Sequence, residues 1–299
     1  MKLNFSKQEI LALEATCQSE LDAGRLAEKL KAKKSFVSRI LRRLEEKGLI
    51  MVEKTGTYKI IRLSPASHAQ NFKKLFEARR NAKIENWLAG KVISVLIVMA
   101  YAKSGVDMGL IADESGCSKP TIYKILKKLY GAGVANKEGG LAQTRDMLVL
   151  DFASSYADNI QLMLQKPVRG INVSIRIRKH IVLRTDAKKI PAFFSLTGAS
   201  LLAKKYGLEA NLASYDDYYF NLDEIKREIG MEEAFAHAIL ITTLQFRQDM
   251  PVLAIFFARN RRRFDMGKLG GYAKKYRVET EVEELRRTVE YHNKMEELK

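Results

Sequence analysis

The sequence has few of the residues that build disulfide frameworks or metal clusters. Its 299 residues include only two cysteines, Cys17 and Cys117, and neither lies in a close cluster of cysteine or histidine. This spacing argues against a disulfide framework and a structural zinc site. The longest apolar run, residues 92–101, is far shorter than the roughly 20 residues of a membrane span. The N-terminus, MKLNFSKQEI, has no apolar signal segment, so we expect a cytoplasmic protein without a membrane partner.

Acidic residues are scarce relative to basic ones. The chain has 52 Lys and Arg against 35 Asp and Glu, a net charge of +17. Residues 1–150 carry 27 basic and 15 acidic side chains, a net +12, which leaves +5 for the rest. An apolar content of 46% indicates a globular protein. A basic excess concentrated in one half therefore indicates a nucleic-acid partner better than a membrane surface.

A stretch of the first half recurs without a gap 85 residues later. LDAGRLAEKLKAKKSFVSRILRRLEEKGLI, residues 21–50, superposes on VDMGLIADESGCSKPTIYKILKKLYGAGVA, residues 106–135. The identical positions are Asp22, Gly24, Ala27, Lys34, Ile40, Leu41, Leu44 and Gly48, which recur as Asp107, Gly109, Ala112, Lys119, Ile125, Leu126, Leu129 and Gly133. Apolar residues upstream of both stretches also match. Shared spacing of apolar positions predicts one supersecondary unit used twice.

Each unit is predicted to fold as helix, helix, turn, helix and β-hairpin. In the first unit the helices cover about residues 7–17, 23–30 and 34–47. Val37, Ile40, Leu41 and Leu44 form one buried stripe on the third helix, and Gly48 ends it as a left-handed C-cap. Strands over residues 49–54 and 57–63 form a hairpin, the wing. The second wing, residues 136–144, is short and glycine-rich and contains Glu138.

The residues SFVSRILRRLEEKGLI, and more loosely SKPTIYKILKKLYGAGVA, resemble the winged helix-turn-helix of MarR-like and related transcription regulators. The resemblance covers about half of the chain. It implies a DNA-binding transcription regulator whose third helix in each unit enters the major groove of double-stranded DNA.

The buried stripe predicts which side chains of the first unit face DNA. Arg39 is the candidate for bidentate guanine recognition. The other candidates are Lys33, Lys34, Ser35, Ser38, Arg42 and Arg43 on the helix, and Lys54, Thr57, Lys59 and Arg62 on the wing. Lysines and Arg43 suit phosphates, where a point charge is enough. The alternative is that these residues are only the solvated faces of basic helices.

The second unit offers a matching set of side chains. Its candidates are Ser118, Lys119, Thr121, Tyr123, Lys124, Lys127 and Lys128. Ser118 is also expected to cap the helix, and Pro120 is tolerated in its first turn. We expect the first unit to be the stronger DNA reader. The second is left open as a weaker reader or as a dimerisation or packing module.

The predicted domains are residues 1–64, the first winged helix, and 91–145, the second, with connector helices over 65–90 and 146–166. Trp87 is expected in the core, and the connectors could build a homodimer or pack within the chain. Residues 167–299 are predicted to form an α+β domain. Its strands are expected at residues 171–176, 180–184, 192–196, 218–222 and 252–257, and its helices at 199–206, 232–244 and 281–297. The fold class is therefore multidomain, two winged modules followed by an α+β domain.

Residues 195–220 resemble the start of the nucleotidyltransferase-like fold, which also occurs in AbiEi-type antitoxins. An active site of that kind needs two carboxylates on one face of a strand to hold Mg²⁺. Asp216 and Asp217 are adjacent and therefore point to opposite faces. We expect an inactive domain, no enzyme, and neither cofactor nor metal. A nucleotidyltransferase recruited to nucleic acid, an antitoxin-type regulator and a protein-interaction adaptor are the alternatives.

One basic cluster lies outside the winged units. Arg259, Arg261, Arg262 and Arg263 could extend the nucleic-acid surface or bind a phosphorylated effector, and the alternative is a solvated loop. The four histidines are scattered, so no hydrolytic triad is expected. The α+β domain is expected to bind a small-molecule or protein effector or to form a dimer.

Overall fold

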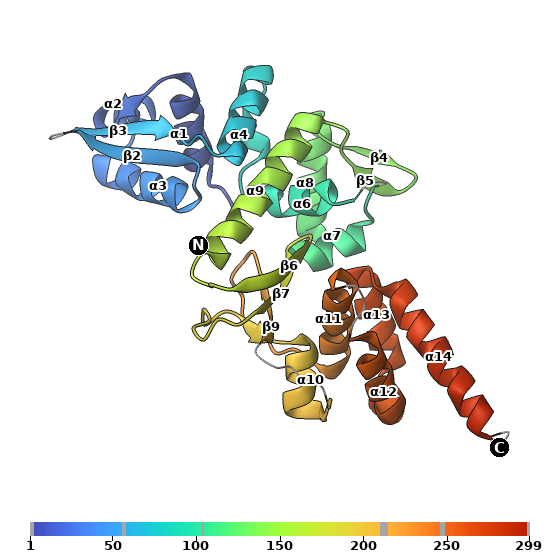
Figure 1. Ribbon diagram of the computed structural model, residues 1–299. Helices are drawn as coiled ribbons and strands as arrows, with labels where there is room; N and C mark the ends of the chain where they lie inside the picture. Colours follow the sequence, from blue (N-terminus) through green and yellow to red (C-terminus); the bar gives the residue numbers. More distant parts are fainter. Residues whose placement is uncertain (1–2, 56–57, 103–104, 210–214, 246–248, 298–299) are drawn as a thin grey trace. The chain divides into compact units, whose positions relative to one another are not determined.

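The computed structural model describes residues 3–55, 58–102, 105–209, 215–245 and 249–297 (Figure 1). Its contacts divide the chain into two compact units, Met1–Leu164 and Gln165–Lys299. Both units mix helices with small sheets. Within the described ranges, no helix has the length and apolar character needed to cross a membrane.

The first unit opens with the predicted helices and hairpin. α1 (Lys7–Gln18) begins at a capping box between Ser6 and Glu9. β1 (Leu21–Asp22) leads into α2 (Ala23–Lys29), which Asp22 caps through its carboxylate, and α3 (Lys34–Glu46) follows. β2 (Ile50–Thr55) and β3 (Tyr58–Leu63) form an antiparallel hairpin, and the sheet order is β1-β3-β2.

The same order of elements returns in the second half of this unit. α6 (Val92–Ala100), α7 (Met108–Ser115) and α8 (Lys119–Gly131) precede a hairpin of β4 (Asn136–Glu138) and β5 (Leu141–Gln143). α3 and α8 begin and end 85 residues apart. Gly48 and Gly133 follow them with left-handed φ values of 69° and 62°, a conformation that glycine adopts at no steric cost. The sequence repeat is therefore a repeat of structural elements.

The single helix expected over residues 65–90 is wrong. The structure has α4 (Ser67–Ala78) and the short α5 (Ile84–Trp87), separated by a turn in which Lys83 takes a left-handed φ of 42°. A side chain with a β-carbon takes that conformation only where surrounding contacts hold it, so the periodicity did not show the break. Trp87 is buried, as expected. The second connector is continuous, α9 (Met147–Gln165).

α4 and α9 pack against each other in antiparallel directions. Phe72 meets Phe152 edge to face, with ring centroids 5.4 Å apart. Towards the N-terminal end of α4, His68 lies beside Tyr156. Beyond its C-terminal end, Arg79 forms an ion pair with Asp146, which precedes α9. The two connectors therefore pack within the chain.

The second unit has a four-stranded antiparallel sheet of order β6-β7-β9-β8. Its strands are β6 (Ile171–Ile177), β7 (His180–Thr185), β8 (Ser195–Leu196) and β9 (Asp216–Asn221). Its helices are α10 (Gly198–Tyr206), α11 (Met231–Leu244), α12 (Met250–Asn260), α13 (Met266–Tyr276) and α14 (Glu279–Glu297), with a 3₁₀ turn η1 (Arg261–Arg263) after α12. α13 was not expected from the sequence, and only two residues of the strand expected at 192–196 are extended.

The buried strand expected at residues 252–257 is also wrong, because this segment lies inside α12. Leu253, Phe256 and Phe257 are buried there, whereas Ile255 is exposed. This spacing is that of one helix face. A short apolar run does not distinguish a buried strand from a helix by periodicity alone, and Pro251 at the start of the run is accepted in the first turn of a helix.

A buried ion pair connects the end of α3 to α1. The Lys47 Nζ lies 2.8 Å from Glu9 Oε1 and donates to the Asn4 carbonyl at 2.7 Å. It also lies 4.4 Å from the centroid of the Phe5 ring. Both charged side chains are almost completely inaccessible to solvent. Each charge is therefore stable in the interior only while the other is present.

Replacing Lys47 with methionine should lower the free energy of unfolding by about 3–5 kcal/mol, because Glu9 would stay buried without its partner. The double variant Glu9→Leu/Lys47→Met should recover most of that loss, since it buries neither charge. Urea unfolding measures both, with the exposed Lys74→Met as control. A double variant as unstable as Lys47→Met alone would contradict this account.

Glu14 should make stability fall as the pH rises towards neutrality. Burial, and secondly the charge of Glu85, raise the pKa of Glu14 from 4.5 to about 7. Between these values the folded protein holds a proton that the unfolded chain has released, so the free energy of unfolding decreases with pH. Glu14→Gln should therefore stabilise the protein by about 2 kcal/mol at pH 8 and not at pH 4. Thermal unfolding at the two pH values tests this, and equal shifts at both would refute it.

Candidate nucleic-acid interface

The outer face of α3 carries the predicted DNA-contacting residues together. Val37, Ile40, Leu41 and Leu44 are buried, so the helix has one fixed orientation. The seven candidates are all exposed on the remaining surface: Lys33, Lys34, Ser35, Ser38, Arg39, Arg42 and Arg43. The Ser38 hydroxyl donates to the Lys34 carbonyl at 3.0 Å. This face can place several cations and hydroxyl groups against one groove of a duplex.

Arg39 has a neighbour that the sequence reading overlooked. Its guanidinium carbon lies 5.5 Å from the centroid of the Phe36 ring, and Phe36 is 38% exposed. A cation held over an aromatic face keeps a smaller set of conformations. An aromatic residue three positions before an arginine, outside the apolar stripe, was the available signal. The geometry suits directional recognition by Arg39.

Two other arginines of the first module are already engaged in ion pairs. Arg42 Nε lies 2.9 Å from Glu46 Oε1. Arg62 lies between Glu20, at 2.9 Å, and Glu53, at 3.1 Å. These pairs are exposed, so they are weak and can be exchanged for phosphate contacts. Arg62 has two carboxylate partners and is therefore the less available of the two.

The first wing places two lysines side by side. Lys54 and Lys59 are directly opposite each other in the β2–β3 register, and both are exposed. Like charges at directly opposed positions destabilise a hairpin. A polyanion bound at this edge would remove that repulsion. Thr57, a further wing candidate, lies outside the described residues.

The outer face of α8 is basic and carries a large aromatic side chain. Lys119, Lys124, Lys127 and Lys128 are exposed, and Tyr123 is 62% exposed. As in α3, a buried stripe on the opposite side fixes the orientation. The face therefore has the charge of α3 but a different set of hydrogen-bonding groups.

The expected cap of α8 by the Ser118 side chain is not formed. Ser118 does occupy the N-cap position with an extended backbone, and Pro120 lies in the first turn. The Ser118 hydroxyl instead lies 2.9 Å from Thr121 Oγ1, a half-buried side chain. The position was predicted correctly, but two neighbouring hydroxyl groups satisfy each other in place of the backbone.

The acidic residue of the second hairpin, Glu138, is paired with a neighbouring arginine. Glu138 Oε2 lies 2.8 Å from Arg145 Nη2 and also accepts a hydrogen bond from Gln143. Between α8 and this hairpin lies a hollow of about 350 Å³, lined in part by Tyr123, Lys127 and Lys137. The negative charge of this wing is therefore compensated next to a basic surface.

The two adjacent acids of the second unit point to opposite sides of β9, as predicted. Asp216 is exposed, and Asp217 is fully buried. Asp217 accepts hydrogen bonds from Arg184 at 2.7 and 3.2 Å and from the Ala199 backbone N–H at 2.9 Å. A β-carbon added to Gly198 would clash with the Asp217 carboxylate. The carboxylate thus fills the turn before α10, so these residues do not fit a metal or phosphate site of the nucleotidyltransferase kind.

The basic cluster at the end of α12 and in η1 is exposed, and two of its four arginines form ion pairs. Arg259 lies 3.1 Å from Glu209, Arg261 lies 3.0 Å from Glu290, and Arg263 donates to Asn260 at 2.9 Å. Arg262 is also exposed. Because these partners belong to the same unit, the cluster presents less free positive charge than its sequence suggests.

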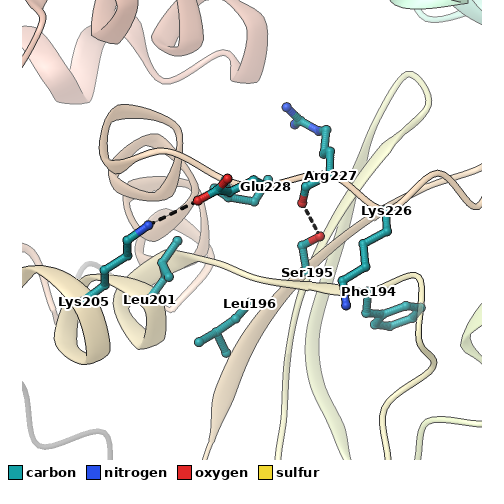
Figure 2. Close-up of a pocket in the computed structure, with 9 residues that line it drawn as sticks. Phe194, Ser195, Leu196, Leu201, Lys205, Lys226, Arg227 and Glu228 are labelled. Atoms are coloured by element: carbon teal, nitrogen blue, oxygen red, sulfur yellow. Dashed lines mark hydrogen bonds and ion pairs between the residues drawn. The ribbon is translucent and has the colours of Figure 1, made fainter.

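The second unit has an open hollow with a volume of about 530 Å³ (Figure 2). It is lined by Phe194, Ser195, Leu196, Leu201, Lys205, Lys226, Arg227, Glu228 and Ile229. At its rim, Lys205 Nζ lies 3.3 Å from Glu228, and Ser195 donates to the Arg227 carbonyl at 2.6 Å. Apolar side chains and charged groups thus share one open site, which can take a small polar ligand.

Comparison with known proteins relates the first module to a known family. A family model described as "Sugar-specific transcriptional regulator TrmB" matches residues 1–67, which cover the first winged module and the first residue of α4. No curated protein and no solved structure matches the chain. The match supports a DNA-binding winged-helix transcription regulator. It concerns the module that carries Arg39 and the lysine pair of the wing.

Replacing both wing lysines, Lys54→Ala/Lys59→Ala, should weaken binding to duplex DNA of any sequence. Two lost phosphate contacts should reduce the slope of log K against log salt concentration by about 2. Fluorescence anisotropy over a salt series measures this slope. The control is Lys188→Ala/Lys189→Ala, an exposed lysine pair of the second unit. An unchanged slope in the wing variant would remove the wing from the interface.

Proposed function

We propose that the protein is a transcription regulator that binds duplex DNA through α3 and the β2–β3 wing. The observation that carries this proposal is the exposed basic face of α3, whose orientation is fixed by the buried stripe on its other side. The family match over residues 1–67 supports the same function.

The chemistry of the face suggests a division of tasks. Lys33, Lys34 and Arg43 bind phosphates, which sets affinity and its dependence on salt but carries no sequence information. Arg39 reads a guanine through two parallel hydrogen bonds in the major groove, and Phe36 limits its movement. Ser35 and Ser38 lie on the same face and contact neighbouring bases or phosphates.

The second module contributes further DNA contacts through α8. Its basic face offers Lys119, Lys124, Lys127 and Lys128 to phosphates, and Tyr123 to a base edge or the backbone. The pairing of Glu138 with Arg145 supports this role, because the neighbouring cation offsets part of the repulsion between Glu138 and the duplex.

The second unit binds the effector of the regulator. The name of the matched family refers to sugars, and the hollow in Figure 2 combines an apolar surface with charged side chains that can hydrogen-bond to sugar hydroxyl groups. We therefore propose a small polar ligand such as a sugar at this place. Arg259, Arg261, Arg262 and Arg263 remain an accessory candidate for an anionic partner.

Substitutions on α3 should separate specificity from affinity. Arg39→Ala should weaken binding to the preferred DNA sequence by about 1–3 kcal/mol and leave binding to other sequences almost unaffected. Lys34→Ala should weaken binding to all sequences alike and lower the slope of log K against log salt concentration by about 1. In vitro selection identifies the preferred sequence, and gel-shift titrations of both variants measure the two effects. If both variants bind like the original protein, α3 is not the reading helix.

A further inference from the structure

The two modules of the first unit correspond residue by residue. Up to the ends of α3 and α8 the shift is 85 residues, as their bounds show. The second hairpin is shorter, so the helices that follow the wings, α4 and α9, begin 80 residues apart, at Ser67 and Met147. These two shifts identify the counterpart of each residue in the other module.

Several counterparts touch each other. Phe5 and Gly90, 85 residues apart, form an antiparallel bridge, in which the Gly90 N–H donates to the Phe5 carbonyl at 2.8 Å. Phe72 and Phe152, 80 residues apart, meet with ring centroids 5.4 Å apart. Asn71 Nδ2 donates to the carbonyl of its own counterpart, Asp151, at 3.3 Å. In a symmetric dimer, a residue meets its own copy only near the two-fold axis.

Two contacts away from these positions form a matched pair, as two-fold symmetry predicts. Arg79 Nη1 donates to the Ala132 carbonyl at the end of α8, at 3.3 Å. Its counterpart, Asn159, donates through Nδ2 to the Lys47 carbonyl at the end of α3, also at 3.3 Å. Lys47 is in turn the counterpart of Ala132. The residue after each helix is therefore bound by the equivalent position of the opposite module.

We propose that these modules form an internal pseudo-dimer, and that one chain binds one DNA site made of two inverted, unequal half-sites. The proposal rests on the DNA-binding function proposed above. A two-fold relation between α3 and α8 makes them read in opposite directions along a duplex, as the two subunits of a dimeric regulator do. One chain thus supplies both reading helices, which in a dimeric regulator come from two chains.

The half-sites differ because the reading faces differ. Where α3 presents Ser35, Ser38 and Arg39, α8 presents Pro120, Tyr123 and Lys124. Only the first set contains an arginine for bidentate recognition of guanine. A homodimer binds two equal half-sites, whereas this chain fixes an orientation on DNA as well as a position.

Arg79 and Asn159 act as positioning residues for the two reading helices. Arg79 also forms an ion pair with Asp146, so it joins the ends of α4, α8 and the start of α9. Asn159 approaches α3 where Gly48 leaves room, since a β-carbon there would lie 3.0 Å from its Nδ2. These contacts set the spacing at which both half-sites can be bound together.

In vitro selection with the full chain should yield two dissimilar, inverted sequence elements at one fixed spacing. Native mass spectrometry of the complex should show one chain per duplex. Inserting five base pairs between the elements rotates one relative to the other by about half a helical turn, so the two helices can no longer bind both together. Binding should weaken tenfold or more. These measurements use the unmodified protein, so they do not depend on how a variant folds.

Variants then assign the elements to the helices. Lys124→Ala/Lys127→Ala should weaken the preference for one sequence element, and Arg39→Ala should weaken the preference for the other. Arg79→Ala should reduce the penalty of the five-base-pair insertion at least threefold while both elements are still preferred, an effect that a general loss of stability does not produce. Arg80→Ala, the exposed neighbouring arginine, is the matched control and should keep the full penalty.

The outcomes separate this inference from the proposed function. DNA binding through a single element, unaffected by spacing and by changes on α8, would overturn the pseudo-dimer and leave the regulator intact. Two chains on two equal half-sites would do the same. Absence of any DNA binding at low salt would overturn both proposals.

Discussion

Two aromatic side chains, Phe72 of α4 and Phe152 of α9, meet where the helices that follow the two wings pack together. Phe5 and Tyr156 extend this contact, with ring centroids 5.2 Å apart. Buried aromatic residues of this size remove about 150–250 Å² each from water. Separating the modules would expose this surface, so the position of α3 relative to α8 depends on it.

The ends of the two reading helices show how a local signal and a tertiary contact use the same residue. Gly48 ends α3 because a left-handed residue is needed there. Its missing side chain also allows Asn159 to reach the Lys47 carbonyl, which His68 contacts as well, at 3.1 Å. Burial lowers the pKa of His68, so this contact is made by a neutral imidazole. The contacts of Asn159 and His68 thus fix the C-terminal end of α3 on the side opposite its exposed basic face.

The second unit uses its charged residues in a different way. Arg184 and Asp217 form a buried ion pair inside the sheet. Arg227 forms an ion pair with Glu233, which also accepts a hydrogen bond from Tyr276. Such buried networks stabilise one arrangement of the core, provided that every member has a partner. The exposed lysines on the outer faces of α3 and α8 lie in the half of the chain, residues 1–150, that carries most of the net charge. Together with the internal pairs of the second unit, these lysines support assigning DNA to the first unit and a small ligand to the second.

The elements with local signals could be predicted from the sequence. The apolar stripe of α3, the glycine after it and the repeat in α8 fixed the helices and the outward direction of Arg39 and Lys124, because side-chain direction follows from helical spacing. Short apolar runs such as residues 252–257 did not specify helix or strand. Three pairings became apparent only in the folded chain: α4 with α9, Lys47 with Glu9, and Asp217 with Arg184. These contacts join residues far apart in the chain, and their free energy comes from burial that no local pattern encodes.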